Sequence, residues 1–141
     1  MSVYLDTSVL VSLFVRDEMT DIAHSHLSKH PGVVTVSDWT MAEAASALSR
    51  AVRTGGLQRE DAGRAIGAMD LWINRAGRRV EVLPADIREA EFIIRGFETT
   101  LKAPDAVHVV IARRAELALL SFDKGMARAA AALGVALSAA P

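Results

Sequence analysis

The segment VYLDTSVLVSLF, residues 3–14, decides the fold, because an apolar strand runs directly into a charged and hydroxylated turn. Val3 to Leu5 predict a buried strand, and the apolar residues that follow Ser8 predict a helix. Asp6 interrupts the apolar run between the two. In open α/β sheets, ligands bind beyond the carboxyl ends of the strands, so the position of this aspartate favours a role in binding.

Composition narrows the class of protein further. The chain has 141 residues, of which 51% are hydrophobic, and this predicts a single globular domain over residues 1–141. Cysteine is absent, which excludes disulfides and thiolate metal sites and fits a reducing, cytoplasmic location. The N-terminal apolar stretch is too short to span a bilayer, so we expect no membrane association. The net charge of -1 means that any nucleic-acid surface must be local.

Short apolar runs alternate with longer amphipathic stretches, a pattern typical of parallel strands joined by crossover helices. The sequence therefore predicts an α/β fold with a central, mainly parallel sheet of about five strands. The expected strands are Val3 to Leu5, Val33 to Val36, Val80 to Leu83, Ala118 to Phe122 and Val135 to Leu137. Pro31-Gly32, Gly55-Gly56, Gly77 and Pro84 punctuate the helices, and none opens a long linker.

Acidic side chains follow most of the expected strands. They are Asp6 after the first, Asp38 and Glu43 after the second, Asp86 after the third and Asp123 after the fourth. Asp105 differs, because it lies behind Pro104 at the start of a helical stretch, where the helix dipole favours a carboxylate. The carboxyl ends of parallel strands meet at one edge of a sheet, so several of these acids are expected to converge.

Helix capping is the competing explanation for each acid. Capping alone accounts for the positions of Asp38 and Asp86, which we interpret as structural. Glu43 stays open, because TMAE at 40–43 matches a capping box and would make it a structural glutamate. Asp6 is harder to explain in this way, since the hydroxyls of the next two residues would cap the following helix without a charge.

Converging carboxylates have a specific chemical use. Mg²⁺ and Mn²⁺ prefer oxygen ligands, and three or four carboxylates in one crevice make a site for such a hard cation. A cation bound beside a phosphodiester activates water and offsets the negative charge that develops during hydrolysis. The predicted chemistry is phosphodiester hydrolysis.

Four further motifs are VYLDTSVL at the N-terminus, SDWTMAEAASALSR at 37–50, APDAVHVVIA at 103–112 and LLSFDKGMARAA at 119–130. Together they resemble the PIN-domain family, and most closely its VapC-type toxins of VapBC toxin-antitoxin systems. They occur in order over nearly the whole chain. The chain departs from the family pattern mildly, with Ser121 where threonine is usual and an alanine-proline pair before Asp105.

The resemblance implies a PIN-like three-layer α/β/α sandwich with Asp6, Glu43, Asp105 and Asp123 as the catalytic, metal-binding acids. Ser8 and Ser121 would be supporting hydroxyls that orient a ligand or water. The implied cofactor is Mg²⁺, with Mn²⁺ as a substitute. The implied activity is that of an endoribonuclease toxin, which acts on RNA, forms a homodimer and is silenced by a VapB-type antitoxin.

His108 lies three residues after Asp105 and invites a role as general base. We interpret it instead as a hydrogen-bonded core residue, because it falls inside an apolar helical stripe and a metal-activated water needs no histidine. Trp39 and Trp72 are isolated and are interpreted as core or dimer contacts.

Arg50 lies seven residues after Glu43 and returns close to the same helical face. Contact with RNA phosphate, an ion pair with an acidic antitoxin segment and simple solvation all remain open for this side chain.

Two alternatives to a ribonuclease are a catalytically inactive PIN-like binding module and a Mg²⁺-dependent phosphoryl-transfer domain. The second is disfavoured, since a dehalogenase-like site would need a carboxylate where Ser8 stands, and a receiver-like site would need an acid pair beside the first strand. The sequence does not separate an active nuclease from an inactive module. Metal binding without turnover would favour the module.

Overall fold

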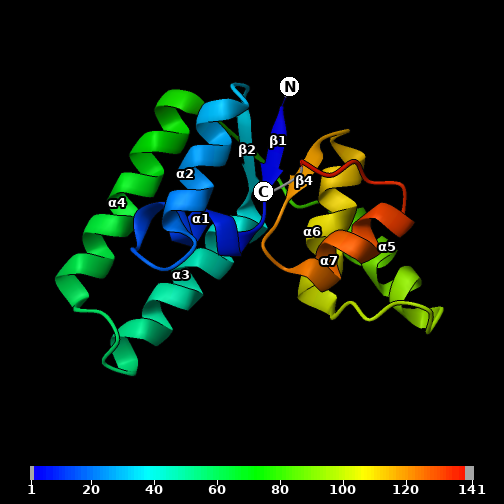
Figure 1. Cartoon of the computed structure of the whole chain (residues 1–141). Helices are drawn as coiled ribbons and strands as arrows, with labels where there is room; N and C mark the ends of the chain where they lie inside the picture. The colour runs from blue at the N-terminus through cyan, green and yellow to red at the C-terminus, as the bar shows by residue number, and fades with distance from the viewer. Residues whose placement is uncertain (1, 139–141) are drawn as a thin grey trace.

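The computed structural model describes residues 2–138, which form a parallel sheet between two groups of helices (Figure 1). The strands are β1 (Val3–Leu5), β2 (Val34–Ser37), β3 (Gly77–Val80) and β4 (Ala118–Leu120). The helices are α1 (Thr7–Phe14), α2 (Thr20–Lys29), α3 (Asp38–Arg53), α4 (Arg59–Ala76), α5 (Pro84–Arg95), α6 (Ala103–Arg114) and α7 (Lys124–Ala132). The predicted α/β fold is confirmed.

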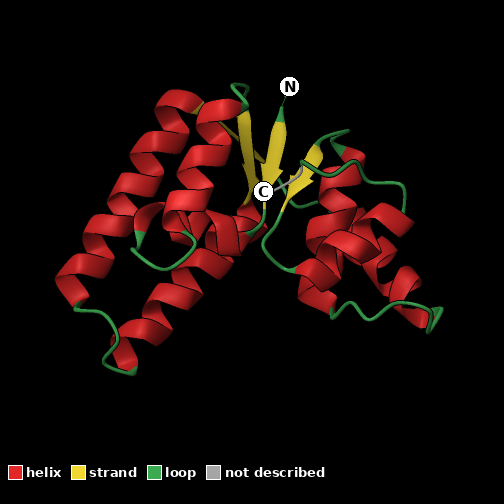
Figure 2. Ribbon diagram, in the orientation of Figure 1, coloured by secondary structure: helices red, strands yellow, loops and turns green. Residues whose placement is uncertain are grey.

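The sheet has the strand order β3-β2-β1-β4, and every neighbouring pair is parallel. Helices α1 to α4 lie on one side of the sheet and α5 to α7 on the other, which gives the expected three layers (Figure 2). Because the strands are parallel, their carboxyl ends all lie at the same edge of the sheet.

The side chains of β1 alternate between two hydrophobic clusters, as a strand requires. Val3 and Leu5 pack in the cluster formed with α1 to α4, whereas Tyr4 packs in the cluster formed with α5 to α7. Both faces of this central strand are therefore buried. The continuous apolar run in the sequence is the expected signature of such a strand.

The third predicted strand was wrong by three residues, since β3 is Gly77–Val80 rather than Val80 to Leu83. β3 lies at the edge of the sheet and is only half-buried, so it does not need an apolar run. The chain passes from α4 straight into β3 at Gly77. A Cβ atom there would lie 3.1 Å from Ile73, so this close passage favours glycine.

The fifth predicted strand, Val135 to Leu137, is reduced to an isolated bridge in the described residues. Leu137 pairs with Leu119 in parallel, and the backbone of Leu119 bonds to Ala136 and Ser138 at 2.8 and 2.9 Å. The segment thus extends the sheet beside β4 without forming a regular strand. Within residues 2–138 the sheet accordingly has four strands and this bridge, against a prediction of about five strands.

Candidate metal and nuclease site

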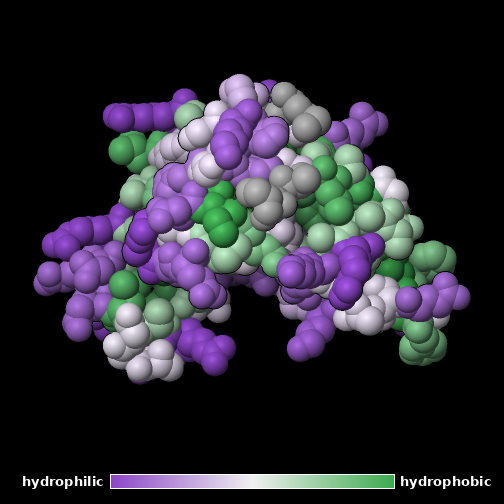
Figure 3. Space-filling model, in the orientation of Figure 1, coloured by the Kyte–Doolittle hydropathy of each residue, from purple (hydrophilic) through white to green (hydrophobic). Residues whose placement is uncertain are grey.

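The candidate site lies at the carboxyl ends of β1 and β4, between α3 and α6. Asp6 follows β1, Glu43 comes from α3, Asp105 from the first turn of α6, and Asp123 follows β4. In the orientation of Figure 1 the strands point downward, and Figure 3 shows that the surface below them is hollowed. The fold therefore brings the four predicted acids to one open edge of the sheet.

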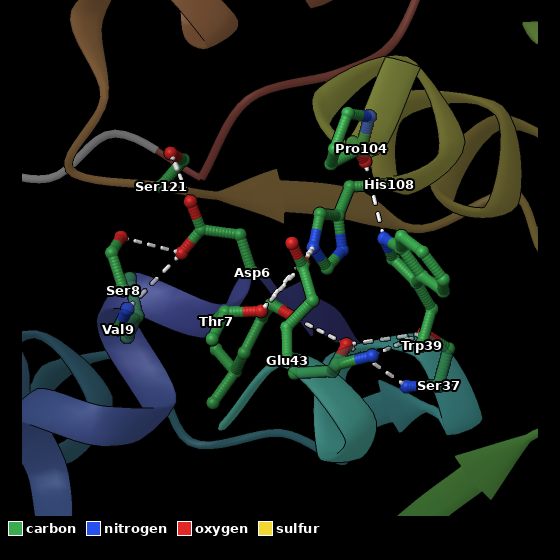
Figure 4. A network of polar contacts seen from close by, with 12 residues as sticks. Asp6, Thr7, Ser8, Val9, Ser37, Trp39, Glu43, Pro104, His108 and Ser121 are labelled. Carbon is green, nitrogen blue, oxygen red and sulfur yellow. Dashed lines mark hydrogen bonds and ion pairs between the residues drawn. The ribbon is translucent and has the colours of Figure 1, made fainter. Parts of the chain in front are cut away.

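Asp6 is buried, with 2% of its surface exposed, and its carboxylate is held by several donors (Figure 4). Oδ1 accepts hydrogen bonds from the Ser8 hydroxyl at 2.7 Å and from the Val9 N–H at 3.1 Å. Oδ2 accepts a hydrogen bond from the Ser121 hydroxyl. The bond from Val9 makes Asp6 the N-cap of α1, so the expectation that hydroxyls would cap this helix was wrong. Asp6 is a cap and also a carboxylate at the sheet edge.

Glu43 lies toward the site and takes no part in capping α3. The capping box of that helix is formed by Ser37 and Thr40, which excludes the capping role that the sequence had left open for Glu43. Its Oε1 accepts a hydrogen bond from the Thr7 hydroxyl at 2.9 Å and also contacts Nε2 of His108. Burial raises the pKa of Glu43, but its interactions with His108 and the hydrogen bond from Thr7 outweigh this and hold the pKa below its usual value.

His108 is 1% exposed and forms hydrogen bonds on both ring nitrogens. Nδ1 lies 2.8 Å from the Tyr4 hydroxyl, and Nε2 faces Glu43. The prediction of a hydrogen-bonded core histidine is confirmed. Sequence reasoning missed Tyr4 as part of the site. A signal was present, because a tyrosine in a strand buried on both faces needs a partner for its hydroxyl.

Asp105 is half-buried, and no residue among 2–138 donates a hydrogen bond to its carboxylate. Burial raises its pKa, and the negative charges of Asp123, Glu43 and Asp6 raise it further, against an opposing effect of His108. The acids are therefore close enough to repel one another. This mutual repulsion is the electrostatic condition under which a bound cation is favoured.

Asp123 is exposed and begins α7 as its N-cap. Its side chain accepts a hydrogen bond from the Met126 N–H at 2.9 Å, and its own N–H donates to the Ser121 hydroxyl at 3.0 Å. Ser121 therefore links two of the acids, since the same hydroxyl donates to Asp6. The two predicted supporting hydroxyls, Ser8 and Ser121, both donate to the carboxylate of Asp6, and their role in orienting a ligand or water stays a prediction.

The donors fit a hard divalent cation in their chemistry, because the four predicted ligands are all carboxylates. As placed, however, no three His, Asp or Glu side chains of residues 2–138 converge closely enough to hold a metal ion. A cation that bound here would have to draw the carboxylates closer together. The assignment of the four acids as ligands stays a prediction.

The remaining predicted residues lie outside the carboxylate group. Arg50 is exposed on α3, about two turns beyond Glu43. Asp38 forms an ion pair with Arg79 at 2.6 Å. Both tryptophans pack against the hydrophobic clusters, and the Trp39 ring N–H also donates to the Pro104 carbonyl at 3.2 Å.

In the described part of the chain, no helix is long and apolar enough to cross a membrane.

The PIN domain model matches residues 3–132, and the chain belongs to the PIN-domain family. No curated protein matches the chain. The resemblance noted in the sequence is thus confirmed at the level of the family.

Solved structures share the fold at low sequence identity. VapC20 from Mycobacterium tuberculosis, a sarcin-ricin loop cleaving toxin, is 20% identical with a TM-score of 0.74, over 99% of both chains. VapBC2 from Rickettsia felis, bound to a DNA fragment from its promoter, is 12% identical with a TM-score of 0.68, over 91% of this chain and 92% of that one. A toxin-antitoxin complex from Klebsiella pneumoniae is 22% identical with a TM-score of 0.58, over 87% and 93%.

Proposed function

We propose that this protein is a Mg²⁺- or Mn²⁺-dependent endoribonuclease that acts as the toxin of a type II toxin-antitoxin system. The observation that carries the proposal is the group of acids that the fold brings to one edge of the sheet, where burial and the charges of the other acids raise the pKa of Asp105. Membership of the PIN-domain family and the similarity of the fold to VapC20 support the same function. The similarity to VapBC2 and to a toxin-antitoxin complex supports an antitoxin partner.

In this proposal Asp6, Glu43, Asp105 and Asp123 hold the cation. When bound, the cation lowers the pKa of water and offsets negative charge on the phosphate. The protein contributes position: Ser8 and Ser121 fix both oxygens of Asp6, and Thr7 fixes Oε1 of Glu43. These bonds limit the freedom of two ligands before the cation arrives, which reduces the entropy lost on binding.

Cleavage of RNA tests the proposal. Purified, antitoxin-free protein is incubated with a total RNA pool in Mg²⁺ or Mn²⁺, and the fragment ends are mapped. We expect discrete cuts that are lost with a chelator and in Asp6→Asn, which keeps an N-cap residue. The matched control is Asp38→Asn, an exposed acid paired with Arg79, which should cut normally.

The outcomes separate the alternatives. Mn²⁺ binding without cuts on any RNA would favour an inactive PIN-like binding module. Absence of both cuts and Mn²⁺ binding would reject the carboxylate group as a metal site. Cuts that survive both the chelator and Asp6→Asn would contradict metal-dependent chemistry at this edge of the sheet.

Arg50 is proposed as a contact for RNA, because it is exposed on the helix that carries Glu43. If it contacts one phosphate of a single strand, Arg50→Ala should reduce the slope of log K against log salt by about 0.7. Arg75→Ala, an exposed arginine near the end of α4, serves as the control. An unchanged slope in Arg50→Ala would exclude the phosphate contact and leave an antitoxin ion pair or solvation.

The proposed partners are a VapB-type antitoxin and a second copy of this chain. Sedimentation of the protein alone tests the homodimer, and co-purification with the product of a neighbouring small reading frame tests the antitoxin. Inhibition of the cuts by that product is the expected result.

A further inference from the structure

A chain of hydrogen bonds runs from the start of α3 to Glu43. Figure 4 shows Ser37 at one end of this chain and His108 and Glu43 at the other. Tyr4 lies in its middle, with its hydroxyl 2.8 Å from Ser37 Oγ, 3.1 Å from Thr40 Oγ1 and 2.8 Å from His108 Nδ1. These four side chains are at most 1% exposed. Water has little access to them, so their protons must be shared among themselves and the nearby backbone.

The direction of each bond follows from the donors available. Glu43, when ionised, only accepts, so Nε2 of His108 must carry a proton. In a neutral ring Nδ1 is then an acceptor, and the Tyr4 hydroxyl is the donor that lies beside it. Because the Tyr4 hydroxyl donates to His108, its oxygen accepts the hydrogen bond from the Ser37 hydroxyl.

The start of α3 completes the chain in the same direction. Ser37 Oγ accepts the N–H of Thr40 at 3.0 Å, and Thr40 Oγ1 accepts the N–H of Ser37 at 3.2 Å. The Thr40 hydroxyl donates to the Leu5 carbonyl at 3.3 Å. Each hydroxyl therefore donates one hydrogen bond. The Ser37 hydroxyl, which belongs to the capping box of α3, donates to Tyr4, and the Tyr4 hydroxyl donates to His108.

The chain fixes one oxygen of Glu43 and leaves the other available. His108 and Thr7 both contact Oε1, and no donor among residues 2–138 bonds to Oε2. With the opposite tautomer, Nε2 would present a lone pair to the carboxylate, and the two groups would repel. The tautomer of His108 thus decides whether Glu43 is held in this position.

We propose that Tyr4 and His108 form a positioning pair, in which the Tyr4 hydroxyl selects the Nε2–H tautomer of His108 and His108 holds Glu43 for the cation. The second half rests on the proposed function, because it takes Glu43 as a ligand. The first half does not, since the tautomer is a property of the protein alone.

The tautomer is measured directly by two-bond ¹H–¹⁵N correlation spectra of protein labelled with ¹⁵N-histidine, without metal and near pH 7. The His108 signals are assigned by their loss in His108→Gln. We expect the neutral Nε2–H tautomer in the wild type and a change in the tautomer population in Tyr4→Phe. An Nδ1–H tautomer or a doubly protonated ring in the wild type, or no change in Tyr4→Phe, would overturn the proposal.

Metal affinity tests the second half in the same variants. Loss of a residue that positions a ligand typically weakens metal binding about 10- to 100-fold, and we expect a loss of this size for Mn²⁺ in Tyr4→Phe and His108→Leu. His108→Gln should retain most of the affinity, because its amide still donates to Glu43. Cleavage should lose kcat while KM for RNA stays unchanged.

Controls separate positioning from folding and from failure of the proposed function. Trp72→Phe removes a ring N–H outside the site and should change neither Mn²⁺ binding nor the His108 signals. Urea unfolding identifies variants that lose Mn²⁺ only because they unfold. If the wild type binds no Mn²⁺ and the tautomer behaves as expected, the proposed function fails while the Tyr4 and His108 pairing stands. If folded Tyr4→Phe binds Mn²⁺ as tightly as the wild type, the positioning role is wrong.

Discussion

Asp86 and Asp105 occupy similar places in neighbouring helices but have opposite surroundings. Each follows a proline in the first turn, Pro84 in α5 and Pro104 in α6. Asp86 is 1% exposed, and the Arg114 guanidinium binds both its oxygens, at 2.7 and 2.9 Å, while the Leu83 N–H adds a third bond at 2.8 Å. Asp105 has no donor among the described residues, and its burial together with the charges of the other carboxylates raises its pKa.

The difference teaches how to recognise the functional acid. A buried carboxylate with an arginine and a backbone donor is satisfied by the protein and contributes to the fold. A carboxylate that repels neighbouring carboxylates destabilises the folded protein when no cation is bound, and such destabilised groups are typical of functional sites. Position in the sequence does not separate these two cases, but the partners of each carboxylate do.

The largest expected effect is a loss of RNA cleavage when Asp105 of α6 is changed. The same loss on changing Asp86 of α5 would contradict the comparison. Asp105→Asn should lose at least about 100-fold in activity, because a direct ligand matters more than a residue that hydrogen-bonds to a ligand, whose loss costs about 10- to 100-fold. Asp86→Asn, assayed where it is folded, should cleave like the wild type. Equal losses in both variants would show that Asp105 is no more functional than Asp86.

The free energy of unfolding should show the opposite pattern, with the loss in the variant of Asp86 rather than in that of Asp105. Asp86→Asn weakens charged hydrogen bonds that each contribute about 1.5–3 kcal/mol, so we expect the free energy of unfolding to fall by about 2 kcal/mol. Urea unfolding at pH 7 measures this change. Glu91→Gln, which removes a carboxylate from an exposed ion pair with Arg95, is the control and should change little. A loss no larger than that of the control would mean that the buried pair is not structural.

Asp6 is both the N-cap of α1 and a proposed metal ligand, so two variants of this residue test the structural and the functional role separately. Asp6→Asn keeps a good N-cap and loses the charge, whereas Asp6→Ala also loses the bond from Val9. We expect both variants to be inactive, with Asp6→Ala less stable than Asp6→Asn by about 1 kcal/mol in thermal or urea unfolding. Equal stability would show that the cap of α1 contributes nothing, and activity in Asp6→Asn would remove Asp6 from the metal site.

The smallest expected effect is on stability, and it tests the repulsion between Asp105 and the other carboxylates directly. The pKa of Asp105 is raised by the fold, so its ionised form is disfavoured in the folded state and lowers stability as pH rises through the folded pKa. Asp105→Asn removes this charge, and with a chelator present the variant should unfold at a slightly higher urea concentration than the wild type at pH 7. A clear loss of stability would contradict the repulsion.

Part of this account could be predicted from the sequence because it depends on local pattern. Asp6 was selected as a candidate ligand from its place after a buried strand, and His108 was correctly assigned to the core from its apolar neighbours. The edge strand β3 was misplaced, because a half-buried strand lacks the apolar run that marks a central one.

The rest of the site depends on contacts between distant residues, which no local pattern encodes. Thr7 looked like a cap for α1, but its hydroxyl bonds to Glu43, which is 36 residues away. Tyr4 reaches His108 across 104 residues. Such pairs become visible only when the sheet has placed the ends of β1, α3 and α6 together.

The measurement that tests the central claim most directly is calorimetric titration of Mn²⁺ into the wild type, Asp105→Asn and Asp86→Asn at pH 7. Asp86→Asn controls for any general effect of removing a carboxylate behind a proline. The account predicts that Asp86→Asn binds like the wild type and that Asp105→Asn loses the heat of binding. Binding of equal affinity in Asp105→Asn and the wild type would contradict the claim that the repelled carboxylate holds the cation.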